Sequence, residues 1–148
     1  LMEAAGDDGD FDALCQQLHR YQATLRTCFT LENFDNLIKN GRMRPIVGTL
    51  LRSLGIHSIA DATAEGTIHV ADKARGVGKT YRAITALMKA SKDCTDAEVV
   101  ISHCENLEGA MALKRQILAD LPVKQVDLLS CRGLTSFYAM EKGLIVGY

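Results

Sequence analysis

The chain has no tryptophan and only four tyrosines and four phenylalanines, so its core must rest on Leu, Ile, Val, Ala and Met. No apolar run approaches the roughly 18 residues that a membrane helix needs, which argues against stable membrane insertion. No charge of either sign dominates, because 17 Lys and Arg balance 18 Asp and Glu. That balance gives no electrostatic reason to expect nucleic acid or an anionic membrane as the main partner.

Paired cysteine motifs are also missing. Five cysteines are an odd number, and no two of them form a C-x-x-C pair. Without a signal peptide in view, the pattern indicates reduced, mostly buried thiols in a cytoplasmic protein. We expect a structural role for each thiol, with no nucleophile and no metal site among them. The cysteines are Cys15, Cys28, Cys94, Cys104 and Cys131.

The length of 148 residues is enough for one domain with a real core, so we expect a single domain over residues 1–148. The chain opens as if a helix were entered partway, which suggests a fragment. Asp10 can cap a helix over residues 10–26, whose apolar residues recur at three- and four-residue spacing and predict a buried stripe. Thr30 can cap a second helix that ends at Asn40-Gly41.

An unusually apolar helix is predicted after Pro45. It either fills the core or also lines an apolar cavity. Two β-prone runs, 56–62 and 67–71, predict a hairpin. A strand at 98–104, a helix capped by Asn106 and a strand at 125–131 predict a parallel crossover.

The last strand carries Leu144, Ile145 and Val146 without alternation, which is typical of a strand in the middle of a sheet. The fold class is therefore α/β, a two-layer mixed sheet of about five strands with helices mainly on one face. Polar residues precede this strand and would lie at a sheet end, where ligands often dock. The pattern predicts a lobe that grips a small amphipathic ligand.

A basic stretch from Lys73 to Thr80 has some features of a phosphate-binding loop. Such a loop needs glycine five places before the glycine of Gly78-Lys79-Thr80, and Lys73 stands there instead. No later strand ends in an acidic residue placed to hold Mg²⁺. Nucleotide binding or phosphoryl transfer stays an alternative. Another is a protein-docking domain that uses the basic edge formed by Arg75, Lys79 and Arg82.

The ordered set of segments resembles the C-terminal half of DegV-family proteins. It comprises Phe29-Thr30-Leu31-Glu32-Asn33, Gly41-Arg42-Met43, the apolar helix, the Ile56–Ala71 hairpin, Lys73-Ala74-Arg75-Gly76, Ile101-Ser102-His103, Gly133–Ala139 and Gly143–Gly147. DegV-family proteins are bacterial fatty-acid-binding proteins that include the FakB subunits of fatty acid kinase.

The resemblance implies the C-terminal lobe of a two-lobed α/β protein that holds one long-chain fatty acid. The tail would lie in an apolar tunnel, with the carboxylate near the interface with the N-terminal lobe. An ATP-binding fatty acid kinase subunit would phosphorylate the presented carboxylate. This chain would then be a carrier and not an enzyme, with no catalytic residue and no cofactor, only the bound fatty acid as ligand.

Two departures from the family affect the headgroup site. The N-terminal lobe is absent from the sequence, and Tyr138 stands where many relatives have a histidine that contacts the carboxylate. We therefore expect the isolated chain to bind fatty acid weakly or not at all. The expected headgroup residues are Arg42, Ser136 and Tyr138. The expected tail residues, which could equally be ordinary core, are Leu37, Ile46, Leu50, Leu54, Ile56, Ile59 and Phe137.

Overall fold

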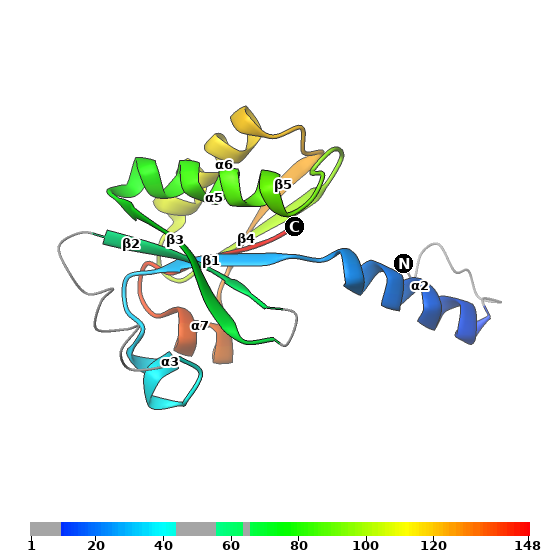
Figure 1. Ribbon diagram of the computed structural model, residues 1–148, viewed down its shortest axis with the longest axis horizontal. Helices are drawn as coiled ribbons and strands as arrows, with labels where there is room; N and C mark the ends of the chain where they lie inside the picture. The colour runs from blue at the N-terminus through cyan, green and yellow to red at the C-terminus, as the bar shows by residue number, and fades with distance from the viewer. Residues whose placement is uncertain (1–9, 44–55, 64–65) are drawn as a thin grey trace.

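The computed structural model describes residues 10–43, 56–63 and 66–148. They form an open six-stranded sheet in the order β3-β2-β1-β6-β4-β5 (Figure 1). Among these strands only β4 and β5 pair in parallel, and every other neighbouring pair is antiparallel. The mixed α/β class is thus confirmed, with one strand more than the five expected. The strands are β1 (Thr27–Leu31), β2 (Ile56–Ala62), β3 (Ile68–Arg75), β4 (Glu98–His103), β5 (Gln125–Ser130) and β6 (Leu144–Gly147).

Helices lie on both faces of the sheet (Figure 1). Two of the longer ones, α5 (Val77–Ser91) and α6 (Leu107–Asp120), cover one face, as expected. Two short ones, α3 (Asp35–Lys39) and α7 (Gly133–Ala139), lie together at the other face. The predicted helix after Pro45 lies outside the described residues.

The central position of β6 is confirmed, since it pairs with β1 on one side and β4 on the other. Its Leu144 and Val146 are buried in the core beneath α5 and α6, together with Ile84 and Ile101. Because side chains alternate along a strand, the intervening Ile145 points to the opposite face. There it packs against a second, smaller core formed around Leu31, Phe34, Leu37, Met43 and Ala139.

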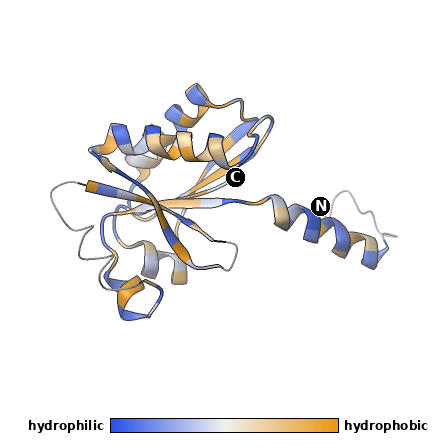
Figure 2. Cartoon of the chain, in the orientation of Figure 1, coloured by the Kyte–Doolittle hydropathy of each residue, from blue (hydrophilic) through white to orange (hydrophobic). Residues whose placement is uncertain are grey.

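The first described helix, α2 (Phe11–Thr24), begins as expected, with the Asp10 carboxylate accepting a hydrogen bond from the Asp12 N–H at 3.0 Å. The predicted burial of its apolar stripe is wrong for this chain, because no residue of α2 is buried. The helix projects away from the sheet, with hydrophobic and hydrophilic residues alternating along it (Figures 1 and 2). The exposed fractions of its apolar side chains include 74% for Phe11 and 51% for Tyr21.

Thr30 does not cap a helix. It lies in β1, paired with Ile59 and Leu144, and its side chain is buried. The following helix, α3, begins later, and the Asn33 side chain accepts from the Asp35 N–H at 2.8 Å. The Cys28–Leu31 run has strand propensity and is paired with a strand on each side. These two effects outweigh the ability of the threonine hydroxyl to cap a helix.

Candidate functional site

A cavity of about 370 Å³ opens on the α3/α7 face of the sheet. Its floor comes from β1 and β6, its sides from α3 and α7, and one end from the beginning of β3. Most of its lining is apolar, and the polar groups are few. The lining residues are Phe29, Leu31, Leu37, Gly41, Arg42, Gly66, Thr67, Ile68, Tyr138, Ala139 and Ile145. We call this cavity the groove.

Strand register explains the apolar floor. Phe29 on β1 is paired with Ile145 on β6, so both side chains point to the same face. Leu31 lies two residues after Phe29 and faces the same way. The alternate residues Cys28 and Thr30 face α5 and α6 instead. Because side chains alternate along the strand, β1 contributes residues to both cores.

Two polar side chains stand in the lining of the groove. Arg42 follows α3, where Gly41 takes a φ of 68° and the Arg42 N–H donates to the Leu37 carbonyl at 2.8 Å. Tyr138, near the end of α7, packs edge-on against Phe137 with ring centroids 5.1 Å apart. Within the described residues neither the Arg42 guanidinium nor the Tyr138 hydroxyl has a hydrogen-bond partner, so both can serve a ligand.

The segment before β6 has a backbone suited to glycine. Met140 adopts φ 54° with ψ 179°, a region that is essentially reserved for glycine, and Lys142 adopts φ 65°. A Cβ at Gly143 would overlap the Ala139 carbonyl. This turn holds Tyr138 and Ala139 against the groove, and the chain accepts backbone strain there.

The structure brings only some of the expected site residues together. Leu37, Arg42 and Tyr138 line the groove. Ser136 and Phe137 lie on α7 but not in the lining, and the Phe137 carbonyl instead accepts from the Asn36 side chain at 2.7 Å. The other expected tail residues Ile46, Leu50 and Leu54 lie outside the described residues.

Two residues of β2 do not line the groove either. Ile59 was expected in the tail site, but it is fully buried beneath α5 on the other face of the sheet, paired with Thr30. Ile56 begins β2 and lies beyond the lining. The floor residues Phe29, Leu31, Ile68 and Ile145 were missed, because finding them requires the pairing of strands distant in sequence.

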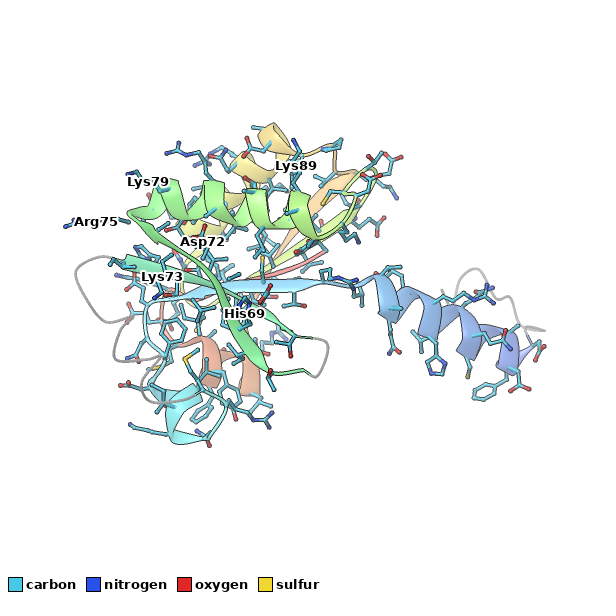
Figure 3. The ribbon with its side chains drawn as sticks, viewed as in Figure 1. His69, Asp72, Lys73, Arg75, Lys79 and Lys89 are labelled. Carbon is cyan, nitrogen blue, oxygen red and sulfur yellow. The ribbon has the colours of Figure 1, made fainter. Side chains whose placement is uncertain are left out.

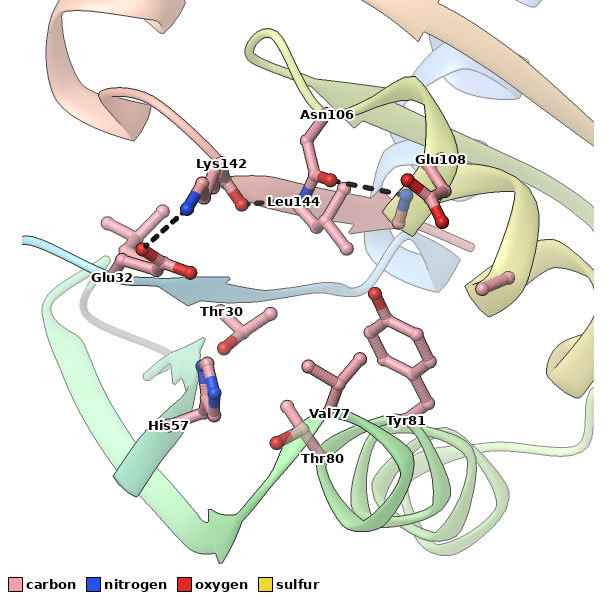
Figure 4. Close-up of a pocket in the computed structure, with 13 residues that line it drawn as sticks. Thr30, Glu32, His57, Val77, Thr80, Tyr81, Asn106, Glu108, Lys142 and Leu144 are labelled. Carbon is pink, nitrogen blue, oxygen red and sulfur yellow. Dashed lines mark hydrogen bonds and ion pairs between the residues drawn. The ribbon is translucent and has the colours of Figure 1, made fainter. Parts of the chain in front are cut away.

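A second cavity, of about 330 Å³, lies on the α5/α6 face near the beginning of both helices (Figure 4). Its lining is more polar. The Thr30 hydroxyl points into it and is buried without a hydrogen-bond partner among the residues described. Lys142 lies 3.8 Å from Glu32, and the pKa of the Tyr81 phenol is raised by burial and by the nearby Glu108 carboxylate.

The geometry of this cavity does not support the nucleotide alternative. Two carboxylates line it, and they would repel a polyphosphate. The Thr80 hydroxyl donates to the Gly76 carbonyl at 3.1 Å instead of standing ready for Mg²⁺. Lys79 is absent from the lining, and Figure 3 shows it with Arg75 at the outer end of α5 and β3.

The part of the chain that the structure describes offers no group of three or more His, Cys, Asp or Glu side chains that could hold a metal ion. It also contains no helix long and apolar enough to cross a membrane.

The fold and the groove define a mixed α/β sheet with an apolar trough on one face. The chain belongs to the DegV family, since residues 1–144 match the family model described as "Uncharacterised protein, DegV family". A DegV domain-containing protein of Streptococcus gordonii is 32% identical over 139 residues, which is 93% of this chain and 49% of that protein. The chain thus spans about half the length of the curated relatives it matches.

Solved structures show the same similarity. The Streptococcus pneumoniae fatty acid kinase (Fak) B3 protein loaded with linoleic acid is 32% identical, with a TM-score of 0.85, over 94% of this chain and 49% of that one. A DegV family protein from Eubacterium eligens loaded with heptadecanoic acid is 27% identical, with a TM-score of 0.87, over 93% and 50% of the two chains. A lipid-binding DegV protein from Thermotoga maritima, at 17% identity and a TM-score of 0.81, shares the fold.

Proposed function

We propose that this chain is the C-terminal lobe of a cytoplasmic protein that binds a long-chain fatty acid, with the acyl tail in the groove. The observation that carries the proposal is a largely apolar trough on the sheet whose lining also contains Arg42 and Tyr138, both without protein partners in the described ranges. Two relatives above 25% identity, the pneumococcal and Eubacterium proteins, were each solved with a fatty acid bound.

The energetics of such a ligand fit an apolar groove better than a polar one. A palmitate-length tail of roughly fifteen methylenes, at about 0.8 kcal/mol each, gives about 12 kcal/mol when fully buried. Immobilising the chain and desolvating the carboxylate remove several kcal/mol of this. An open trough in one lobe covers only part of the tail, so the isolated chain should bind weakly.

At the polar end, we assign the carboxylate to Arg42 and Tyr138, with Ser136 as a further candidate from α7. A guanidinium can pair with both carboxylate oxygens, and a phenol donates a single hydrogen bond. Leu37, Phe29 and Ile145 are the proposed tail contacts, and Phe137, Ile46, Leu50 and Leu54 stay candidates for the tail.

The second lobe is the proposed partner of α2. The helix carries an apolar stripe whose side chains are exposed, such as Leu18 at 42% and Leu25 at 43%. A separate 14-residue helix with no packed face is only marginally stable in water. Relatives of twice the length supply enough further chain to cover such a stripe.

The finer proposal is that the protein presents the carboxylate to an ATP-binding kinase subunit, which converts it to an acyl phosphate. One relative carries fatty acid kinase in its name, and this chain offers Arg75 and Lys79 as an exposed basic edge for docking (Figure 3). In this role the lobe binds and positions, and supplies no catalytic group.

The deciding experiment is extraction of lipid from the protein as its own cells make it, followed by mass spectrometry. A stoichiometric long-chain fatty acid is expected. A protein that carries no lipid, yet whose Lys79 is protected from acylation by Mg-ATP, would instead establish the nucleotide alternative. Binding of the kinase subunit to the lipid-free protein, with no lipid found in any preparation, would favour docking alone.

A further inference from the structure

Two cysteines meet at the ends of β4 and β5. The two strands are parallel and in register from Glu98 opposite Gln125 to His103 opposite Ser130. The Cys131 N–H donates to the His103 carbonyl at 2.8 Å, which carries the ladder one step past the strand ends. The next residue of each strand is a cysteine, so Cys104 and Cys131 lie side by side.

Both thiols face the same side of the sheet. Val99 and Ile101 of β4 and Val126 of β5 are buried beneath α5 and α6. Alternation therefore turns Cys104 and Cys131 to the other face, where both are half-buried against the small core that Tyr138 also contacts. Burial, and to a smaller extent the neighbouring Cys104, raise the pKa of the Cys131 thiol.

The spacing suits a disulfide. Neighbouring strands lie about 4.7–4.9 Å apart, and disulfide-linked residues have Cα atoms about 4.4–6.8 Å apart. Both cysteines lie just beyond the regular strands, where the backbone can adjust to bring the Cβ atoms together. The other cysteines do not compete, because Cys28 and Cys94 are buried in the opposite core and Cys15 lies on the projecting α2.

We propose that Cys104 and Cys131 are an oxidation site that forms an intramolecular disulfide with hydrogen peroxide. One thiolate attacks a peroxide oxygen, the O–O bond breaks, and a sulfenic acid and one water form. The second thiol attacks that sulfur, the S–S bond forms, and the hydroxyl leaves with a proton as a second water. In total, two thiols lose two electrons and one peroxide is reduced to two waters.

The disulfide would tie β4 to β5 under α7, next to the Tyr138 side of the groove. The reactive species is the thiolate, and the pKa of Cys131 is raised. Oxidation should therefore run faster at about pH 8.5 than at about pH 7. A thiol specialised for rapid peroxide sensing has a lowered pKa and is already a thiolate near pH 7, so this pH dependence distinguishes the two.

The test treats the protein with hydrogen peroxide, alkylates the remaining thiols and measures the intact mass. The expected product has lost two hydrogen atoms, retains three alkylated cysteines out of five, and is restored by dithiothreitol. Trypsin cleaves after Lys92, Lys114, Lys124 and Arg132, so the link should join the peptide that carries both Cys94 and Cys104 to the peptide that carries Cys131.

Substitutions show whether Cys104 or Cys94 forms the disulfide. Cys104→Ser should abolish the cross-linked peptide, and the matched Cys94→Ser should leave it intact. The proposal is overturned if the cross-link survives Cys104→Ser. It is also overturned if the wild type gains oxygen atoms on either cysteine without a cross-link, or if the only disulfide joins two chains on a non-reducing gel.

Discussion

Phe29 of β1 lies directly opposite Ile145 of β6, and together they floor the groove on the α3/α7 face of the sheet. These two residues are more than a hundred positions apart in sequence, and antiparallel pairing alone makes them neighbours. The pairing makes Ile145 the natural position at which to fill the groove without touching the larger core beneath α5 and α6.

Ile145→Trp is expected to fill the groove and reduce fatty-acid affinity at least tenfold, because the indole occupies the volume of several methylenes. Leu129→Trp is the matched control. Leu129 points away from the core that Val126 and Leu128 face, is 55% exposed and lies outside the groove lining, so its substitution should leave affinity unchanged. Equal affinity of the Ile145 variant and the wild type, measured by titration calorimetry, would place the ligand elsewhere.

Arg42→Gln tests the charge at the polar end. A hydrogen bond to a charged group contributes roughly 1.5–3 kcal/mol, so affinity for a fatty acid should fall about ten- to a hundredfold. Affinity for the fatty alcohol of equal length should barely change, because it has no carboxylate. Lys39→Gln, at the exposed end of α3, controls for general loss of positive charge. An equal loss for acid and alcohol would show that Arg42 only shapes the groove.

Met140→Gly should stabilise the protein. The wild-type residue occupies a backbone region that costs non-glycine residues about 1–3 kcal/mol, and glycine removes that strain while adding unfolded-state entropy. We expect a net gain of about 1 kcal/mol in urea unfolding. The control, Met111→Gly on an exposed position of α6, should lose about 1 kcal/mol, since glycine is a poor helix former. Loss of stability in both variants would contradict the assigned turn.

The sequence predicted those helices and strands that a local pattern marks, and missed one that depends on tertiary contacts. The lone apolar run at Leu144–Val146 correctly indicated a central strand, because only a strand covered on both faces lacks alternation. By contrast, α7 was missed, since Thr135 and Ser136 are weak helix formers and no apolar period marks the segment. Its position depends on tertiary contacts, including the hydrogen bond from Asn36 to Phe137, which no local pattern reveals.

The structure brings together only part of the expected site residues. Arg42 follows a predicted helix and Tyr138 precedes the predicted last strand. The structure places both residues in the lining of the groove. Ile59 faces away from the groove, which the sequence could not show because an isolated strand pattern does not say which face of the sheet a residue serves. That choice is made by pairing, which sets Ile59 opposite Thr30 on the side of α5.

Alkaline pH should destabilise the protein through Tyr148. Burial raises the pKa of this phenol from 10.0 to about 12, and its hydroxyl lies 2.7 Å from the Ser91 hydroxyl. Because the pKa of Tyr148 is higher in the folded than in the unfolded protein, the protonated phenol stabilises the fold. That contribution is complete below pH 10 and is lost between pH 10 and about 12. The loss from this group is at most about 1.4 kcal/mol per pH unit within that window.

Tyr148→Phe removes that titration, so its free energy of unfolding should fall less between about pH 9 and 11 than that of the wild type. The Cys28 thiol, whose pKa is also raised to about 12 by burial, leaves a residual dependence in both proteins. Ser91→Ala keeps the buried phenol and should retain the wild-type alkaline loss. Parallel pH profiles for Tyr148→Phe and the wild type in urea unfolding would rule out Tyr148 as the source.

The exposed stripe of α2 gives the last prediction, on the proposed second lobe. In the isolated chain, amides of Phe11–Thr24 should exchange with solvent within seconds, because the helix has no buried residue, while amides of α5 stay protected by the core. When the second lobe is present, packing of Leu18, Tyr21 and Leu25 should slow exchange in α2 at least a hundredfold. Leu18→Glu should cancel that protection, whereas Gln17→Glu, a neighbouring polar position, should preserve it. Unchanged exchange in α2 on joining the lobes would mean that the stripe serves a different partner.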